Sequence, residues 1–574
     1  MTSNDANGVA RANRPSVRHD QGMGVAHNPA EIATHAESHR IDTSGGSRRT
    51  ERAWWAALVV AMLVFSAFPI ANYCLGLSTK DYGLWYQVGL AVRQGLEIYP
   101  RPESGRLFPF MYPPSAAAML AWVSMLGPIG SLVTLLLVNS VAWVASIGLS
   151  QWLALGSGVR PHPLVVILPS LSIIVLVYNI YLLGQPNLLL LALLLGSFAC
   201  LRLGRHIGAG ALLATAAAIK AFPILAIGYL IYRRMWTATA ATVAVLAAWL
   251  LIAPLPFRTP AQAVDDLVVW SQGMVFTYNS HGIAQRPFRS YSYKNQSIMA
   301  LAHRLLRDVP ADGESVLSRR AVAGSMGPRP NKGLLAVDPS TDLVSFLKSP
   351  LRPGASTPQL GGTRDVASAG FVGARTTEPT PRWDDVLQDS ESALRAAWRI
   401  NVTDLNFRVV TVITVAAMLG LCIVVAAVMP PKNRQTQKTA AIEFALVTLL
   451  TVMFSPLSFN YAYVWLIYPI TLGLHLVMSE ASTAPWHKLK IVWIATVVSI
   501  PALAIPMPLV AQAYGNLFVP ALLLVFGLGL MLASADCHRS HKLAAVPATH
   551  TGIAFFWSLA NNAASSGEAS SAKD

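Results

Sequence analysis

Long apolar segments recur along this chain, and they constrain its fold more than any single motif does. Residues 54–72 are mostly apolar and follow three arginines, Arg48, Arg49 and Arg52. Such a segment is long enough to cross a hydrocarbon core about 30 Å thick. Over the whole chain 53% of residues are hydrophobic and 12% are charged, against roughly a quarter charged in soluble domains. The sequence therefore predicts an all-α polytopic membrane protein with about 11–13 transmembrane or re-entrant helices.

The basic residues indicate which ends of these helices face the cytoplasm. The formal net charge is +15, and in membrane proteins such an excess gathers in cytoplasmic loops rather than marking a nucleic-acid partner. We expect residues 1–53 to form a disordered cytoplasmic tail and residues 535–574 a second, basic cytoplasmic tail. The predicted location is the cell (plasma or inner) membrane, crossed many times, with both termini inside.

The predicted domains follow the polar stretches. Residues 54–256 and 408–534 are expected to be the N-terminal and C-terminal groups of membrane helices, and residues 257–407 a long outer loop. Within that loop, residues 261–273 and 298–306 have helical apolar spacing. Residues from about 308 to 382 are rich in Gly, Pro, Ser, Thr and Arg without apolar periodicity. That composition predicts a disordered insert.

Three apolar runs are interrupted, and the interruptions affect the topology. The run after Pro114 breaks at the turn sequence of residues 127–130, which predicts a helical hairpin with a second arm over residues 132–153. Residues 163–183 and the run that contains Lys220 are also broken by prolines. With full-length helices there would be twelve spans and Lys220 would lie in mid-membrane. The positive-inside rule instead favours a broken or re-entrant segment at 163–183 and two short helices around Lys220. Snorkelling of Lys220 is the alternative.

The first outer loop, residues 73–114, holds the main candidate for catalysis. Its Asp81 precedes an amphipathic helical pattern and is suited to act as a general base or to bind a cation; a solvated loop aspartate is the alternative. No Asp or Glu lies between Glu103 and Asp265, so few other carboxylates are available at the outer face. The chain has four scattered cysteines, no phosphate-binding glycine loop and no histidine cluster with metal spacing. We therefore predict no metal and no cofactor.

Seven short motifs together resemble glycosyltransferase family 87, whose members include polyprenyl-phosphate-mannose-dependent mannosyltransferases and arabinofuranosyltransferases. The similarity covers about residues 54–530 without the insert. The motifs are, in order, Asp81; Gly95 with Tyr99; Tyr112-Pro113-Pro114; Gly184-Gln185-Pro186-Asn187; Lys220-Ala221-Phe222-Pro223; Asn295-Gln296-Ser297; and Ser455-Pro456-Leu457-Ser458.

The resemblance implies a GT-C fold and an integral membrane hexosyl- or pentosyltransferase of the cell envelope. Such an enzyme moves mannose or a pentose from a polyprenyl-phosphate donor to a lipid or glycan acceptor on the outer face of the membrane. Its partners would be that donor, the acceptor and membrane lipids, with no nucleic acid and no cofactor beyond the lipid-linked sugar. The match implies that Asp81 is the catalytic base. A lipid or solute transporter and a catalytically inactive membrane scaffold are the alternative functions.

The remaining candidates bind substrate. Lys220, Gln185 and Asn187 are expected to bind the donor phosphate or sugar, because they lie on neighbouring outward-facing turns. The further substrate-binding candidates are Tyr82, Tyr112, Asn295, Gln296, Ser458, Asn460 and His281. Family members often have a tryptophan and a histidine pair after the last motif, where this chain has Phe459-Asn460-Tyr461-Ala462. This departure implies different chemistry, another substrate or inactivity, and His281 is the candidate substitute.

Overall fold

The computed structural model describes residues 44–100, 110–157, 159, 161–284, 286–287, 289–312, 397–480, 486–503 and 508–543. By its contacts the chain divides into two units, Met1–Ala56 and Ala57–Asp574. All elements below belong to the second unit, except the start of the first helix, α2 (Ser44–Cys74). The predicted tails fall largely outside the described residues, as does the predicted insert beyond residue 312.

Helices make up almost all of the regular structure that is described, which confirms the predicted all-α polytopic membrane protein. Five stretches are long and apolar enough to cross a membrane, or six if the bent pair α6 (Pro163–Ser172) and α7 (Ile174–Leu183) is one span. The five are Arg52–Cys74 in α2; Pro114–Leu155, which joins α4 (Pro114–Val123), the 3-10 turn η2 (Ser124–Leu126) and α5 (Gly127–Leu155); α17 (Phe407–Val428); α18 (Gln437–Phe454); and Asn460–Met478, which joins η6 (Asn460–Leu466) and α19 (Ile467–Met478).

Shorter helices complete the membrane region. They are α8 (Asn187–Arg202), α9 (His206–Ile219), η3 (Phe222–Ala226), α10 (Ile227–Tyr232), α11 (Trp236–Leu251), α20 (His487–Ala502) and α21 (Leu509–Ala513), and the last helix, α22 (Phe518–Leu543), has an apolar part over Phe518–Ser534. The run that contains Lys220 is therefore split into short helices, as the positive-inside rule predicted.

The segment of residues 163–183 is broken as predicted, but four residues later than its proline. The axes of α6 and α7 differ by 49°, and the two helices meet at Ile173. The Ser172 hydroxyl donates to the carbonyl of Pro169 at 2.7 Å, the carbonyl that an uninterrupted helix would offer to the amide of Ile173. Local bonds of this kind compete with the helical ladder and bend helices.

The predicted hairpin after Pro114 has a shorter first arm than expected. Helix α4 ends at Val123 and rises about 15 Å at 1.5 Å per residue, half of a 30 Å hydrocarbon core. Gly127, with φ of +73°, starts α5 rather than lying in a loop between two arms. Because only glycine adopts this left-handed backbone conformation without cost, the change of direction is fixed there. Helix α4 packs chiefly against α3 (Asp81–Arg93), the helix of the first loop.

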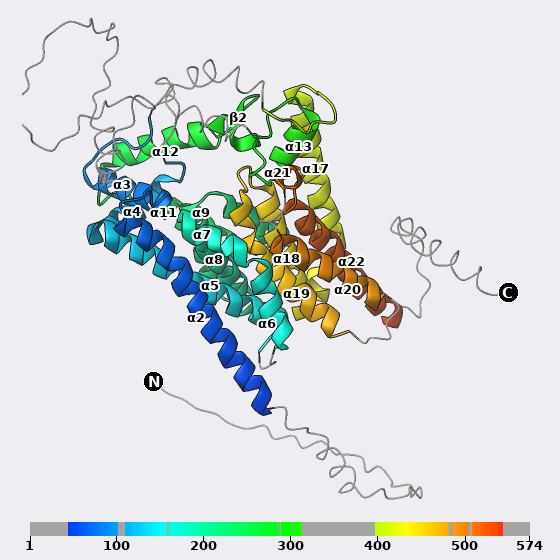
Figure 1. The fold of residues 1–574 in the computed structure, drawn as a ribbon. Helices are drawn as coiled ribbons and strands as arrows, with labels where there is room; N and C mark the ends of the chain where they lie inside the picture. The colour runs from blue at the N-terminus through cyan, green and yellow to red at the C-terminus, as the bar shows by residue number, and fades with distance from the viewer. Residues whose placement is uncertain are drawn as a thin grey trace, which may run out of the picture. The chain divides into compact units, whose positions relative to one another are not determined.

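The described ends of the long loop are ordered. Helices α12 (Pro260–Met274) and α13 (Ile298–Leu306) confirm the two predicted patterns, and α12 starts with a capping box of Thr259 and Gln262. Between them, β1 (Tyr278–Asn279), β2 (Gly282–Ile283) and β3 (Arg286–Pro287) form a small antiparallel sheet in the order β1-β2-β3, with Tyr278 opposite Ile283 and Gly282 opposite Pro287. Figure 1 shows α3, α12 and α13 at the same end of the membrane helices.

Two buried cores stand out in the second unit. One lies between α3, α4 and α12 and contains Trp85, Val88, Phe110, Leu120 and Trp270. The other is an ionic cluster between α10 and α18: Glu443, which is fully buried, accepts hydrogen bonds from Arg233 Nε at 3.0 Å, from Gln435 at 2.7 Å and from the Tyr229 hydroxyl at 2.8 Å. The first core supports the loop helix that begins with Asp81.

Candidate functional site

Asp81 is the first residue of α3, and the chain enters the helix through a strained conformation. Lys80 has φ of +55°, a left-handed value that residues other than glycine rarely adopt. The carboxylate of Asp81 lies at the positive end of the helix dipole, which favours its charge. The next residue anchors this turn, because the Tyr82 hydroxyl donates to the carbonyl of Tyr181 in α7 at 2.9 Å.

The end of α7 is shaped to receive that first turn. Gly184 caps α7 in the left-handed region (φ +79°, ψ 30°), and its amide donates to Ile180 O at 2.9 Å. A Cβ at this position would lie 3.1 Å from the ring of Tyr82. Glycine is therefore required here for its backbone conformation and for the close approach of α3. The turn that follows carries Gln185 and the first residue of α8, Asn187, both buried.

The structure brings three of the predicted residues into one hydrogen-bonded chain. Gln185 Nε2 donates to Oδ2 of Asp81. The Tyr112 hydroxyl donates to Gln185 Oε1 at 3.0 Å. Among the described residues, Oδ1 of Asp81 has no hydrogen-bond partner. The carboxylate is thus held by one oxygen while the other is left to accept a proton.

Lys220 lies beside this group, at the turn between α9 and η3. Its Nζ atom is 3.4 Å from Oδ1 of Asn187 and 5.6 Å from each of the ring centroids of Tyr112, Phe222 and Tyr461. Cations are attracted to the faces of aromatic rings within about 6 Å. The Nδ2 atom of Asn187 is buried without a hydrogen-bond partner in the described part of the chain. A cation and an unused amide donor therefore lie together near Asp81.

Burial and nearby cations act in opposite directions on Asp81. Burial raises its pKa above the ordinary carboxyl value, whereas the hydrogen bond from Gln185 and the charges of Lys220, Arg286 and Lys80 lower it; burial prevails. A carboxylate with a raised pKa is a stronger base than a solvated one. The side-chain contacts of this group suit proton abstraction next to an anionic leaving group.

Arg286 and Tyr461 were missed as site residues in the sequence. Arg286, on β3, donates from Nε to the sulfur of Met111 at 2.6 Å, and its charge reaches Asp81. Tyr461 stands in the stretch where relatives have histidines, and its ring faces the Lys220 ammonium. The sequence has many basic residues and offers no signal that distinguishes Arg286 from the other arginines of the loop. For Tyr461 the only available signal was its position just after the last motif.

Asn295 and Gln296 are fully buried, and they connect the loop before α13 to segments near the C-terminal end of the chain. Asn295 Nδ2 donates to Ser290 O at 2.7 Å and to Pro456 O at 2.9 Å. Gln296 Nε2 donates to Tyr293 O and to Gln512 O, both at 2.7 Å. These contacts give both amides a structural role, Asn295 toward the loop after α18 and Gln296 toward α21, and substrate contact by them stays a prediction.

The other three candidates lie apart from this hydrogen-bonded chain. The buried Ser458 hydroxyl donates to Val452 O at the end of α18. Asn460 Nδ2 lies 3.4 Å from Gln512 Oε1. His281 is exposed on the turn between β1 and β2, where its backbone amide donates to Asn279 Oδ1 at 3.0 Å. Their roles toward substrate stay predictions.

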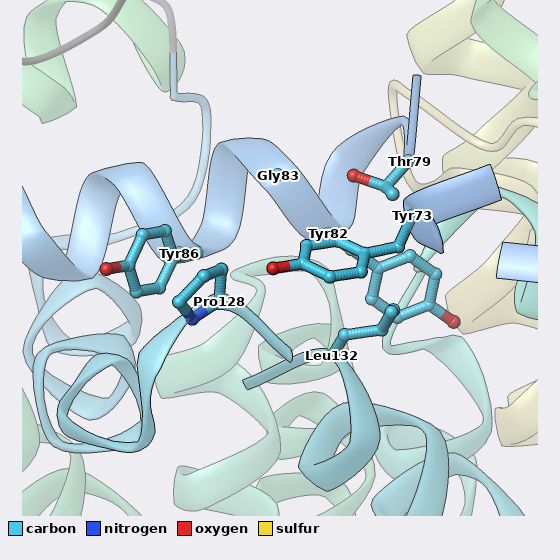
Figure 2. Close-up of a pocket in the computed structure, with 7 residues that line it drawn as sticks. All are labelled: Tyr73, Thr79, Tyr82, Gly83, Tyr86, Pro128 and Leu132. Atoms are coloured by element: carbon cyan, nitrogen blue, oxygen red, sulfur yellow. The ribbon is translucent and has the colours of Figure 1, made fainter. Parts of the chain in front are cut away.

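A small, partly open pocket lies behind the first turn of α3. It is formed by the end of α2, by α3 and by the start of α5, as Figure 2 shows. Its lining residues are Tyr73, Thr79, Tyr82, Gly83, Tyr86, Pro128 and Leu132. Tyr82 thus lines this pocket with its ring while its hydroxyl donates to Tyr181 O in α7. Among the described residues, no three His, Cys, Asp or Glu side chains are placed to share a metal ion.

Comparison with known proteins identifies the class of protein. The many long apolar helices are those of a membrane protein, and the family model that matches part of the chain indicates a membrane glycosyltransferase. The model of glycosyltransferase family 87 matches residues 110–325, a range that includes Tyr112, Gln185, Lys220 and Arg286. This match supports membership of glycosyltransferase family 87. Asp81 precedes the matched residues, so its place in the site rests on the contacts described above. Searches of curated proteins and of solved structures gave no match.

Proposed function

We propose that this membrane glycosyltransferase transfers a sugar, mannose or a pentose, from a polyprenyl-phosphate donor to a hydroxyl of a lipid or glycan acceptor. The observation that carries the proposal is the placement of a carboxylate with one uncommitted oxygen, Asp81, within the electrostatic reach of the Lys220 ammonium. A base for the acceptor and a cation for the leaving group are the two groups that such a transfer requires.

In the proposed reaction Asp81 acts as the general base. Its carboxylate takes the proton of the acceptor hydroxyl, and the hydroxyl oxygen forms a bond to the anomeric carbon of the donor sugar. The bond between that carbon and the phosphate oxygen breaks, and the polyprenyl phosphate leaves with the electron pair. General-base assistance of this kind contributes roughly a hundred- to ten-thousand-fold to a rate.

Lys220 and Asn187 are proposed to stabilise the leaving group. Negative charge grows on the phosphate as the bond breaks, and fixed positive groups at such a position often supply the largest catalytic contribution. The Lys220 ammonium lies 3.4 Å from Asn187 Oδ1, and Asn187 Nδ2 has no partner among the described residues. Both donors are therefore available to phosphate oxygens, with no metal or cofactor in the proposed scheme.

We place this chemistry at the outer face of the cell membrane, with both termini in the cytoplasm. Arg233 and Arg234 end the short helices that follow Lys220, and Lys432 and Arg434 stand between α17 and α18. Basic residues at helix ends favour the cytoplasmic side. The turn with Lys220 precedes α10, whereas Arg233 and Arg234 follow it, which supports an outward position for the site.

The test uses the full chain purified in lipid nanodiscs. The protein is incubated with radiolabelled polyprenyl-phosphate mannose and membrane lipids, and in a parallel reaction with the arabinofuranose donor. We expect a new labelled glycolipid with one of the donors. Asp81→Asn should reduce its formation at least a hundredfold, whereas Asp265→Asn, a matched change on α12, should not.

Three results would contradict the proposal. Wild-type turnover by Asp81→Asn would show that Asp81 is not the base. Movement of labelled substrate across sealed vesicles without a new glycosidic bond would indicate a transporter. Absence of both transfer and transport with every polyprenyl-phosphate sugar would favour an inactive scaffold.

A further inference from the structure

Gln185 uses both ends of its amide within the protein. Only 4% of this residue is exposed. Its Nε2 donates to Asp81 Oδ2, and its Oε1 accepts from the Tyr112 hydroxyl at 3.0 Å. An ionised carboxylate can only accept hydrogen bonds, so the nitrogen end of the amide must face Asp81 and the oxygen end must face a donor. Tyr112 is that donor.

Tyr112 is held rigidly in the position that this requires. Its ring packs on Trp85 and Phe110, with centroids 4.9 and 5.3 Å apart, and its own carbonyl accepts from the Tyr99 hydroxyl at 2.6 Å. Burial raises the pKa of the Tyr112 phenol well above its ordinary value, so the hydroxyl keeps its proton. The orientation of the Gln185 amide is therefore fixed by a neighbour that does not titrate in the working range.

We propose that Tyr112 and Gln185 are positioning residues: the tyrosine hydroxyl orients the glutamine amide, and the amide holds Oδ2 of Asp81 so that Oδ1 faces the acceptor hydroxyl. This inference rests on the proposed function. It gives Gln185 a role toward Asp81 besides the expected contact with the donor phosphate, for which only the second N–H of its amide remains.

The hydrogen bond from Gln185 also lowers the pKa of Asp81 and so opposes the effect of its burial. The charged groups that act on Asp81 are Lys80, Lys220 and Arg286, and Tyr82 and Tyr112 are the phenols that sense its charge. A hydrogen bond to the charged form lowers the pKa of a carboxyl group. Loss of the Gln185 amide should therefore raise the pKa of Asp81 further, while the three cations stay in place.

The decisive experiment titrates Asp81 by infrared difference spectroscopy on the intact protein. The carboxylic acid band that appears on acidification and is lost in Asp81→Asn belongs to this residue. We expect Gln185→Met to move its midpoint up by about one pH unit and Tyr112→Phe, which keeps the packed ring, to move it in the same direction. The double variant should shift it no further than Gln185→Met alone. Ser140→Ala, which removes a 2.8 Å contact to the Tyr181 hydroxyl, is the control and should leave the midpoint unchanged.

Kinetics separate this inference from the proposed function. In the transfer assay both variants should lower kcat, leave the KM for the donor unchanged and move the acidic limb of the pH profile upward. Unchanged midpoints in the infrared titration, or a raised donor KM without a pH shift, would overturn the inference. If the wild-type protein transfers no sugar while the two variants show the shifted infrared midpoints, the proposed function is refuted and the positioning of Asp81 by Gln185 and Tyr112 stands.

Discussion

The Nζ atom of Lys220 lies 3.4 Å from Oδ1 of Asn187, which places the ammonium between the turn after α9 and the first residue of α8. Three aromatic rings surround it at 5.6 Å. The ammonium thus contacts an amide oxygen and the faces of aromatic rings, while the charge of Asp81 acts on it from further away. A cation placed in this way keeps its capacity to bind an anion.

Lys220→Met should weaken use of the lipid-phosphate donor. A hydrogen bond to a charged group contributes about 1.5–3 kcal/mol, so we expect the KM for the donor to rise roughly ten- to a hundredfold. The KM for the acceptor should change little. Lys294→Met, in the loop before α13, is the matched control. An equal rise in both KM values would argue against a phosphate contact at Lys220.

Gly184→Ala should reduce transfer although it adds only one methyl group. The backbone at φ +79° is unfavourable for alanine, and the new Cβ would lie 3.1 Å from the Tyr82 ring. We expect a strain of about 1–3 kcal/mol and a displaced Asp81–Gln185 contact, seen as a lower kcat and a lower Tm. Gly228→Ala is the control, because nothing lies within 4 Å of its Cβ position. Equal activity of the two variants would contradict the role of the α7 turn.

Stability should depend on the protonation of Asp266, which faces Arg258 at 3.2 Å. Burial raises its pKa from 3.8 to about 6 in spite of that arginine. The folded state therefore binds the proton of Asp266 more tightly than the unfolded state does. The stabilisation that this protonation gives the folded state is complete below pH 4 and is lost as the pH rises through 6. A shift of this size corresponds to about 3 kcal/mol.

Asp266→Asn tests this contribution, because an amide does not titrate. We expect the difference in Tm between variant and wild type to grow in favour of the variant as the pH rises from 4 to 7. Asp265→Asn, its neighbour on α12, provides the comparison. A difference that stays constant over this range would show that Asp266 does not titrate there.

The long loop between α11 and α17 should tolerate replacement of residues 313–396 by a short Gly/Ser linker. The described residues on either side of this stretch are joined directly: Ala311 N donates to Trp398 O at 3.0 Å, and Arg399 pairs with Asp308 at 2.5 Å. A short linker closes such a gap at little entropic cost. The shortened protein should insert and keep its Tm within about 3 °C. Loss of membrane insertion would show that the removed residues include a required packed domain.

The sequence by itself determined the elements. Runs of apolar residues predicted the membrane helices, and helical spacing predicted α3, α12 and α13, because a helix is closed by hydrogen bonds between residues four apart. The same reasoning split the run around Lys220, since a charge in mid-membrane is costly. Asp81 was chosen as a candidate from sequence, because few carboxylates stand near the first loop, and its catalytic role stays a prediction.

Tertiary structure alone decided what these residues contact. Asp81 and Gln185 are 104 residues apart, and Arg233 and Glu443 are 210 apart; neither pair has a periodicity that links its members. The same packing brought the Gln185 amide into contact with Asp81 and placed the charge of Arg286 near it. Such contacts depend on how helices pack against each other and on which side-chain atoms remain unsatisfied in the folded protein. The pattern of residues along the sequence carries no information about how the helices pack or about which side-chain atoms remain unsatisfied.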